Sequence, residues 1–272
     1  MLKFFNKSLT WALSIITMAF AFVPETCFKA FKIFKAAPDE VNVIINRFLA
    51  FIIIFIAVII IHIVVRRVRK SIKLKGHGYC IRIEYGDMLK IDNCKKVINF
   101  DECFTTSVGN APSDVKRTSI CGQYLTANPI HNMQELIEKA QLKPTKSKSK
   151  YQSKDRYESG KLVPNGNDLL MAFAKLDKDG RGWFFSRDEY LDCLSVLWNE
   201  IDKYYGQKDV CIPILGSGIT RFEDKLLTQQ ELLDIIVASY KLSSHKLKPP
   251  YQLHIVCKKA DDFSLNRIGE TL

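Results

Sequence analysis

The sequence has little of several features that mark familiar classes of protein. None of its eight cysteines forms a C-x-x-C pair, so the ligand spacing of zinc sites is absent and reduced thiols are expected. Residues 76–272 carry 28 Lys/Arg against 26 Asp/Glu, an excess of only 2, which argues against a nucleic-acid-binding domain. Acidic residues are scarce in residues 1–75, where 12 Lys/Arg against 3 Asp/Glu supply 9 of the 11 net positive charges.

Long apolar runs are confined to the first 65 residues. Residues 48–65 are uncharged, and an apolar segment at 41–45 lengthens this run. Because about 20 apolar residues cross the hydrocarbon core of a bilayer, we predict a transmembrane helix at about 41–65. Residues 8–24 are also uncharged and predict a first membrane helix. A signal peptide cleaved near Ala19-Phe20-Ala21 is the alternative interpretation of the first run.

A basic stretch at 66–75 follows the second run immediately. Its six cations are Arg66, Arg67, Arg69, Lys70, Lys73 and Lys75. Such flanks stay on the cytoplasmic side of a membrane, so under either interpretation of the first run we expect a cytoplasmic C-terminal domain. The stretch could also bind anionic lipid, although its role in topology accounts for it.

Residues 76–272 alternate predicted strands and helices. We expect strands at 79–86, 95–100, 168–176, 210–215 and 251–258, and helices at 131–141, 186–205 and 228–242. The last two helices open with capping boxes, Ser186 to Glu189 and Thr228 to Glu231. The Lys/Ser-rich segment 143–161 predicts an exposed, mobile loop. This order of elements predicts a three-layer α/β/α domain with a mixed sheet.

Residues 177–188 resemble a calcium-binding loop only superficially. Asp177 and Asp179 occupy its first and third positions, and Gly182 occupies its sixth. Arg181, however, occupies a position that needs an oxygen ligand, and Asp188 replaces the bidentate Glu. We therefore expect a hairpin turn and no metal site.

The segment 212–222 is the most informative motif, because an apolar strand runs directly into Gly216-Ser217-Gly218. Uncovered backbone N–H groups in such a turn can cradle phosphate oxygens. The third glycine of a dinucleotide-binding fingerprint is replaced by Arg221, and a tight turn without ligand is the alternative. Its place after a buried strand favours ligand binding. Asp87 and the pair Asn99 and Asp101 stand at comparable strand ends.

Together these three segments resemble the macro domain, a three-layer α/β/α family that binds ADP-ribose and its derivatives. The resemblance implies that Asp87 holds the adenine amine, Gly216 to Thr220 wrap the diphosphate and Asn99 lies at the distal ribose. The ligand-binding residues that it implies are Asp87, Met88, Asn99, Asp101, Ser119, Gly122, Gln123, Gly216, Ser217, Gly218, Ile219, Thr220, Arg221 and Phe222. Family members that remove ADP-ribose carry Asn-Ala-Ala-Asn and a glycine run where this chain has Asn99-Phe100-Asp101-Glu102.

The stretches FDECFTT, TSICGQY, LWNEIDKYY and ELLDIIVASYKLS look like the macro-like effectors of bacterial Thoeris anti-phage defence, which carry two N-terminal transmembrane helices. The resemblance implies a multi-pass protein of the bacterial inner membrane, without cofactor or catalysis. It would bind an ADP-ribose-derived signal, a histidine adduct, made by a TIR-domain partner. Homo-oligomerisation would then disrupt the lipid bilayer. The alternative is a membrane-anchored ADP-ribosyl hydrolase in which Asp101 or Glu102 activates water.

Overall fold

The computed structural model describes residues 2–22, 24–29, 38–182, 186–218, 227–261 and 263–268. The chain divides into two compact units, Met1–Arg69 and Lys70–Leu272. The first unit is helical, and the second contains all seven strands that the described residues form.

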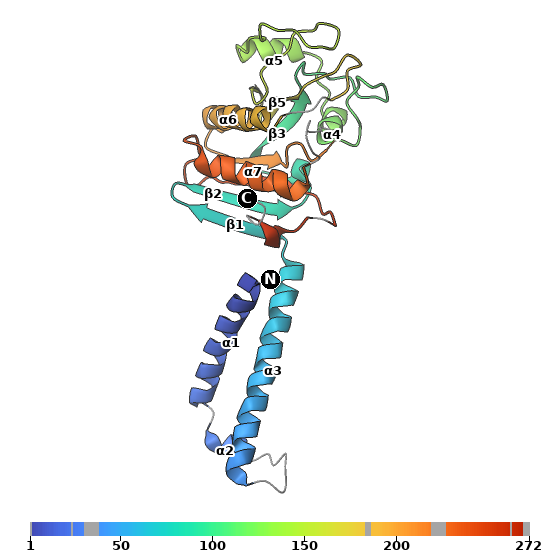
Figure 1. The fold of residues 1–272 in the computed structure, drawn as a ribbon. Coiled ribbons are helices and arrows are strands. Elements are labelled where there is room, and N and C mark those ends of the chain that lie inside the picture. Colours follow the sequence, from blue (N-terminus) through green and yellow to red (C-terminus); the bar gives the residue numbers. More distant parts are fainter. Residues whose placement is uncertain are drawn as a thin grey trace. The chain divides into compact units, whose positions relative to one another are not determined.

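The helical unit consists of α1 (Leu2–Phe22), the short α2 (Glu25–Lys29) and α3 (Asp39–Val68). The helices α1 and α3 lie side by side (Figure 1) and bury Ala12, Ile16 and Val58 between them. Polar contacts join α2 to α3: the Asn46 side-chain amide donates a 2.7 Å hydrogen bond to the carbonyl of Phe28. Most other large apolar side chains of α1 and α3 are exposed within this unit, as expected of helices that face lipid.

One helix within the described ranges, α3, is long and apolar enough to span a membrane. Its 30 residues extend about 45 Å, and it continues past the predicted end at 65 into the basic residues. The apolar part of α1 is shorter, Leu9–Met18. The predicted span at 41–65 therefore has its helix, whereas α1 does not pass the same test.

The second unit is built on a mixed sheet of β1 (Ser71–Gly76), β2 (Tyr79–Tyr85), β3 (Cys94–Asp101), β4 (Leu162–Asn165), β5 (Asp168–Ala174), β6 (Asp209–Pro213) and β7 (Leu253–Cys257). The strand order is β1-β2-β7-β6-β3-β5-β4. The five inner strands are parallel, and β1 and β4 pair antiparallel with their neighbours at the two ends. All five parallel strands consequently end at the same edge.

Helices cover both faces of this sheet, as the three-layer prediction requires. On one face α6 (Arg187–Tyr204) and α7 (Gln229–Leu242) pack against the strands, and Figure 1 shows them side by side. On the other face lie α4 (Ile120–Ala127) and α5 (Met133–Lys139). The apolar residues of β5 contribute to both hydrophobic cores. Leu169 and Met171 lie in the first core, and Leu170 and Ala172 lie in the second. Both faces of the strand are therefore buried, which explains its run of apolar residues.

Local signals located most of these elements correctly. The five predicted strands are all present, and both predicted capping boxes form: Ser186 with Glu189, and Thr228 with Glu231. Three elements were not predicted, namely β1, α4 and β4. Two short 3₁₀ helices, η1 (Met88–Lys90) and η2 (Leu265–Arg267), complete the unit. The eight cysteines form no disulfide bond among the described residues.

The Lys/Ser-rich segment 143–161 differs from the exposed loop that its composition predicted. Ser149 and Tyr157 are buried, and the ring of Tyr157 lies 5.5 Å from that of Phe104. The prediction of exposure is wrong for these two residues, because their partners lie about 50 positions away in the sequence and composition does not reveal them.

Candidate functional site

The candidate site lies along the edge where the parallel strands end. Asp87 follows β2, Gly216 follows β6, and Asn99 and Asp101 belong to the last residues of β3. The strand order β2-β7-β6-β3 therefore brings three segments that are far apart in the sequence to one edge. Ligands of parallel sheets bind beyond this edge.

A cavity of about 690 Å³ opens at the ends of β3 and β5. Three of the predicted site residues line it: Asn99, Asp101 and Ser119. Most of the remaining wall comes from two segments that we did not predict to contribute, 110–116 and 177–182. Neither Asp87 nor Gln123 is among the described residues that line it.

Asn99 brings an unusual polar atom to this region. Its Oδ1 is buried and has no hydrogen-bond partner among the residues that the structure describes. A buried acceptor without a donor costs about 1–3 kcal/mol. A ligand hydroxyl or amine in the cavity would satisfy this atom, and the role of Asn99 in binding stays a prediction.

Asp101 has its carboxylate held close to its own backbone. Its Oδ1 accepts hydrogen bonds from the backbone N–H groups of Cys103, at 2.8 Å, and Thr105, at 3.1 Å. Burial raises the pKa of Asp101, and hydrogen bonds from Thr105 and Cys103 offset only part of that effect. The ionised form is therefore disfavoured beside a cavity proposed to take an anionic ligand.

Ser119, Gly122 and Gln123 shape the start of α4. The Ser119 hydroxyl accepts from the N–H of Gly122 at 3.0 Å and donates to the carbonyl of Lys116 at 2.6 Å. A Cβ added to Gly122 would lie 2.1 Å from that same carbonyl oxygen, so packing alone requires glycine. The Gln123 side-chain amide donates to the carbonyl of Thr118 at 2.9 Å. These contacts are structural, and ligand contact by the three residues stays a prediction.

Asp87 and Met88 lie at the far side of the same edge. The Asp87 carboxylate accepts from the N–H of Leu89 at 3.1 Å and caps η1. It remains 44% exposed, with Lys90 Nζ at 3.6 Å, and so is open to an incoming amine. The Met88 side chain is buried in the second core, which leaves only its backbone for a ligand.

The glycine-containing turn after β6 has the conformation that its sequence predicts. Gly216 has φ +82°, a left-handed conformation that favours glycine. The N–H and hydroxyl of Ser217 both donate to the carbonyl of Ile214, at 3.3 and 2.7 Å. A Cβ added to Gly218 would meet none of the described residues within 4 Å. The predicted residues Ile219, Thr220, Arg221 and Phe222 lie outside the described residues.

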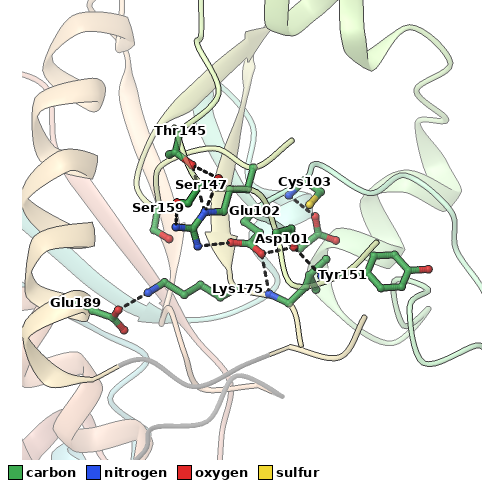
Figure 2. A network of polar contacts seen from close by, with 12 residues as sticks. Asp101, Glu102, Cys103, Thr145, Ser147, Tyr151, Ser159, Lys175 and Glu189 are labelled. Carbon is green, nitrogen blue, oxygen red and sulfur yellow. Dashed lines mark hydrogen bonds and ion pairs between the residues drawn. The ribbon is translucent and has the colours of Figure 1, made fainter. Parts of the chain in front are cut away.

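Glu102 follows the predicted site residue Asp101 in the sequence, and its contacts were not predicted. It is buried, and its Oε1 accepts from the Ser149 hydroxyl at 2.5 Å and from the N–H of Leu176 at 3.2 Å. Arg156 Nη1 lies 3.6 Å from its Oε2. Figure 2 shows polar contacts around Glu102. The Glu102 carboxylate joins the end of β3 to the segments that contain Ser149, Arg156 and Leu176.

These contacts bear on the hydrolase alternative. A general base must reach the water that it activates, yet Glu102 is occupied by Ser149, Leu176 and Arg156. Asp101 uses one oxygen to accept two backbone N–H groups. Burial raises the pKa of the neighbouring Cys103 to about 11, so this thiol is not an activated nucleophile.

The turn 177–182 forms one wall of the cavity. Asp177 Oδ1 accepts from the N–H groups of Asp179 and Arg181, at 2.9 and 2.8 Å, and Leu176 bridges to Gly182 across the turn. This is the hairpin turn that the sequence predicted up to residue 182. Within the described ranges no cluster of three His, Cys, Asp or Glu side chains could hold a metal ion.

Comparison with known proteins gives concordant results. A family profile described as "Thoeris protein ThsA, Macro domain" matches residues 81–258. The Thoeris protein ThsA of Bacillus amyloliquefaciens (strain Y2) is 30% identical over 233 residues, which cover 80% of this chain and 77% of that protein. Among solved structures, the Oceanobacillus iheyensis macrodomain with ADP gives a TM-score of 0.46 at 11% identity, covering 70% of this chain and 88% of that chain. The macrodomain of Thermus aquaticus DarG gives 0.38 at 15% identity, covering 66% and 98%.

Proposed function

The chain belongs to the family of the Thoeris protein ThsA macro domain, and from this premise we propose that it is an anti-phage defence effector whose sheet domain binds an ADP-ribose-type ligand. The observation that carries the proposal is the cavity of about 690 Å³ at the ends of β3 and β5. It lies on the edge where parallel sheets bind ligands, and three of the residues predicted from the sequence, Asn99, Asp101 and Ser119, line it.

The ligand would lie across the strands of this edge. Asp87 after β2 would accept the adenine amine, the backbone after β6 at Gly216 to Gly218 would hold the diphosphate, and Asn99 at the end of β3 would meet the distal ribose. Neighbouring strands are about 4.8 Å apart, so these positions fall in the order in which the ligand's parts follow one another. The distal group would then enter the cavity beside Asp101 and Ser119.

The signal itself would be the histidine adduct of ADP-ribose from a TIR-domain partner. The wall of the cavity carries charges of both signs, with Asp114 and Asp177 beside Lys116 and Arg181. Such a wall suits a distal group that is itself both acidic and basic, because each charge would meet an opposite charge. The adduct is therefore a better candidate than ADP-ribose alone.

The membrane is the proposed target of the response. Helix α3 has the length and hydropathy of a span, and α1 packs against it, so the two together would form the membrane part. Ligand binding would favour a homo-oligomer of the chain, which would cluster these helices and disrupt the bilayer. The ligand can drive this step only if it binds the assembled state more tightly than the unassembled one.

Dye release from vesicles tests this proposal. The full chain is reconstituted into vesicles loaded with a self-quenching dye, and the histidine adduct, ADP-ribose or ADP is added. We expect the adduct to release dye and to shift the chain to a larger species in cross-linking. If the adduct binds but no dye is released, the proposed membrane role is wrong. If the chain cleaves the adduct to ADP-ribose and histidine, the chain is a hydrolase.

A further inference from the structure

A basic segment begins the sheet domain, and the ligand site makes no use of it. Strand β1 is the end strand of the sheet, so one of its sides has no neighbouring strand among the described residues. It pairs with β2 over six residues, and the N–H of Tyr85 donates to the carbonyl of Lys70 at 3.0 Å. The lysines of this segment, Lys70, Lys73 and Lys75, are therefore fixed to the sheet, and we call them the basic edge.

Alternation along β1 separates the lysines from the core. Ile72 and Leu74 pack against the first hydrophobic core, so Lys73 and Lys75 point to the opposite face of the sheet. All three lysines of the basic edge are exposed. The cross-strand partner of Lys73 is Arg82, and like charges directly opposite each other repel.

The carboxylate on this face of β2 does not neutralise the lysines. Glu84 Oε2 accepts from Arg82 Nε at 2.9 Å, and its Oε1 lies 3.1 Å from His254 Nδ1. Both oxygens of Glu84 are thus engaged with the side chains of Arg82 and His254. Within the described residues, none of the three lysines of the basic edge forms an ion pair.

We infer that the basic edge binds the headgroups of anionic phospholipids, an inference that rests on the proposed membrane role of α3. Arg69 alone separates Lys70 from Val68, the last residue of α3, and one extended residue advances the chain by about 3.5 Å. The negative cytoplasmic leaflet attracts lysines that lie this close in sequence to a span. Since the chain is already held at the membrane, this attraction orients the sheet domain and does not have to recruit it.

Lysines on an edge strand also have a simpler role, which is to keep the edge from pairing with another sheet. That role depends on charge repulsion between proteins and is independent of lipid composition. The two roles therefore differ in one observable, the accessibility of the lysines at membranes of different charge.

The test measures the acylation rate of individual lysines in the full chain by mass spectrometry, with a membrane-impermeant reagent. The chain is reconstituted into phosphatidylcholine vesicles with or without about 30 mol% phosphatidylglycerol, a composition that gives a strong negative surface potential. We expect Lys73 and Lys75 to react about five-fold more slowly on the anionic vesicles and to recover at about 1 M salt, where the Debye length is about 3 Å. Lys178, exposed on the turn at the cavity, is the control and should not change.

The inference would be overturned if Lys73 and Lys75 were acylated at equal rates on the neutral and the anionic vesicles. It would also be overturned if inorganic phosphate slowed their acylation on neutral vesicles, because that would indicate a site for soluble anions. Lys73→Glu with Lys75→Glu should restore the reactivity of Lys70 on anionic vesicles, whereas Lys178→Glu should not. Retention of the chain in vesicles after an alkaline wash is measured separately. If the chain were not retained, the proposed membrane role of α3 would be wrong. Failure of the proposed function can therefore be distinguished from failure of the lipid-binding inference.

Discussion

The Ser149 hydroxyl donates a 2.5 Å hydrogen bond to Oε1 of Glu102, 47 residues away in the sequence. This contact fixes a Lys/Ser-rich segment to the residue that follows β3. Because Asp101 and Asn99 immediately precede Glu102 and line the cavity, the same contact also holds the wall of the ligand site. We therefore expect substitutions of Glu102 to change both the stability of the fold and ligand binding.

Replacing Glu102 tests how much its contacts stabilise the fold. Glu102→Ala leaves the Ser149 hydroxyl, the Leu176 N–H and the Arg156 guanidinium without their partner, and should lower the free energy of unfolding by about 3 kcal/mol. Ser149→Ala removes one hydrogen bond to a charged group and should cost about 1.5 kcal/mol. Urea unfolding of the protein in detergent micelles measures both. Equal losses for the two variants would contradict a central role for Glu102.

The turn after β6 allows stability and ligand binding to be separated. Gly218→Glu should leave the free energy of unfolding nearly unchanged, because a Cβ there meets none of the described residues, yet its carboxylate should weaken diphosphate binding at least about 100-fold. Gly216→Glu should weaken both, because its φ of +82° costs a non-glycine residue about 1 kcal/mol. Gln207→Glu, an exposed change before β6, is the control. Normal binding by Gly218→Glu would place the diphosphate elsewhere.

Substitution of Asn99 also distinguishes an effect on ligand binding from an effect on stability. Asn99→Ala removes a buried acceptor that has no described partner, so the free energy of unfolding should stay the same or rise. If a ligand hydroxyl donates to Oδ1, affinity should fall about 10-fold with the loss of that hydrogen bond. Asn165→Ala, on the β4–β5 hairpin, is the matched control. Unchanged affinity would remove Asn99 from the site.

Asp101 predicts a dependence on pH. Burial raises its pKa in the folded protein above the unfolded value of about 3.9, so the carboxyl stabilises the fold fully below that value and less as pH rises through the folded pKa. Wild-type stability should therefore decline relative to Asp101→Asn between about pH 4 and neutrality. Thermal unfolding across this range measures it, with the exposed Asp92→Asn as control. A difference that is constant with pH would contradict the raised pKa.

The sequence predicted the elements whose signals are local. Strand β5 is uniformly apolar because helices bury both its faces, and α6 and α7 begin at capping boxes that three neighbouring residues define. Strand β1 was missed because its alternating lysines were read as a membrane flank, although Ile72 and Leu74 between them pack into the core. Strand β4 has only four residues and includes Pro164, too few for a periodic pattern.

The site was predictable to the same extent. Asn99 and Asp101 lie at the cavity because the end of β3 can be located from the sequence. Ser119 also lines the cavity, but it was expected only from the family resemblance, since α4 was not predicted. The contacts of Glu102 with Ser149 and Arg156 were not predictable, since they join residues about 50 positions apart and no spacing rule relates them. The contribution of Asp177 and Arg181 to the cavity wall depends likewise on how β5 pairs with β3.

The central claim is that the sheet edge formed by Asp87, Asn99 and Gly216 binds an ADP-ribose-type ligand. Calorimetric titration of the full chain in nanodiscs tests this claim most directly. We predict one site per chain for the histidine adduct of ADP-ribose, weaker binding of ADP-ribose, and no heat with Gly218→Glu under the same conditions. Absence of heat with every ADP-ribose derivative, or equal heat with Gly218→Glu and wild type, would contradict the account.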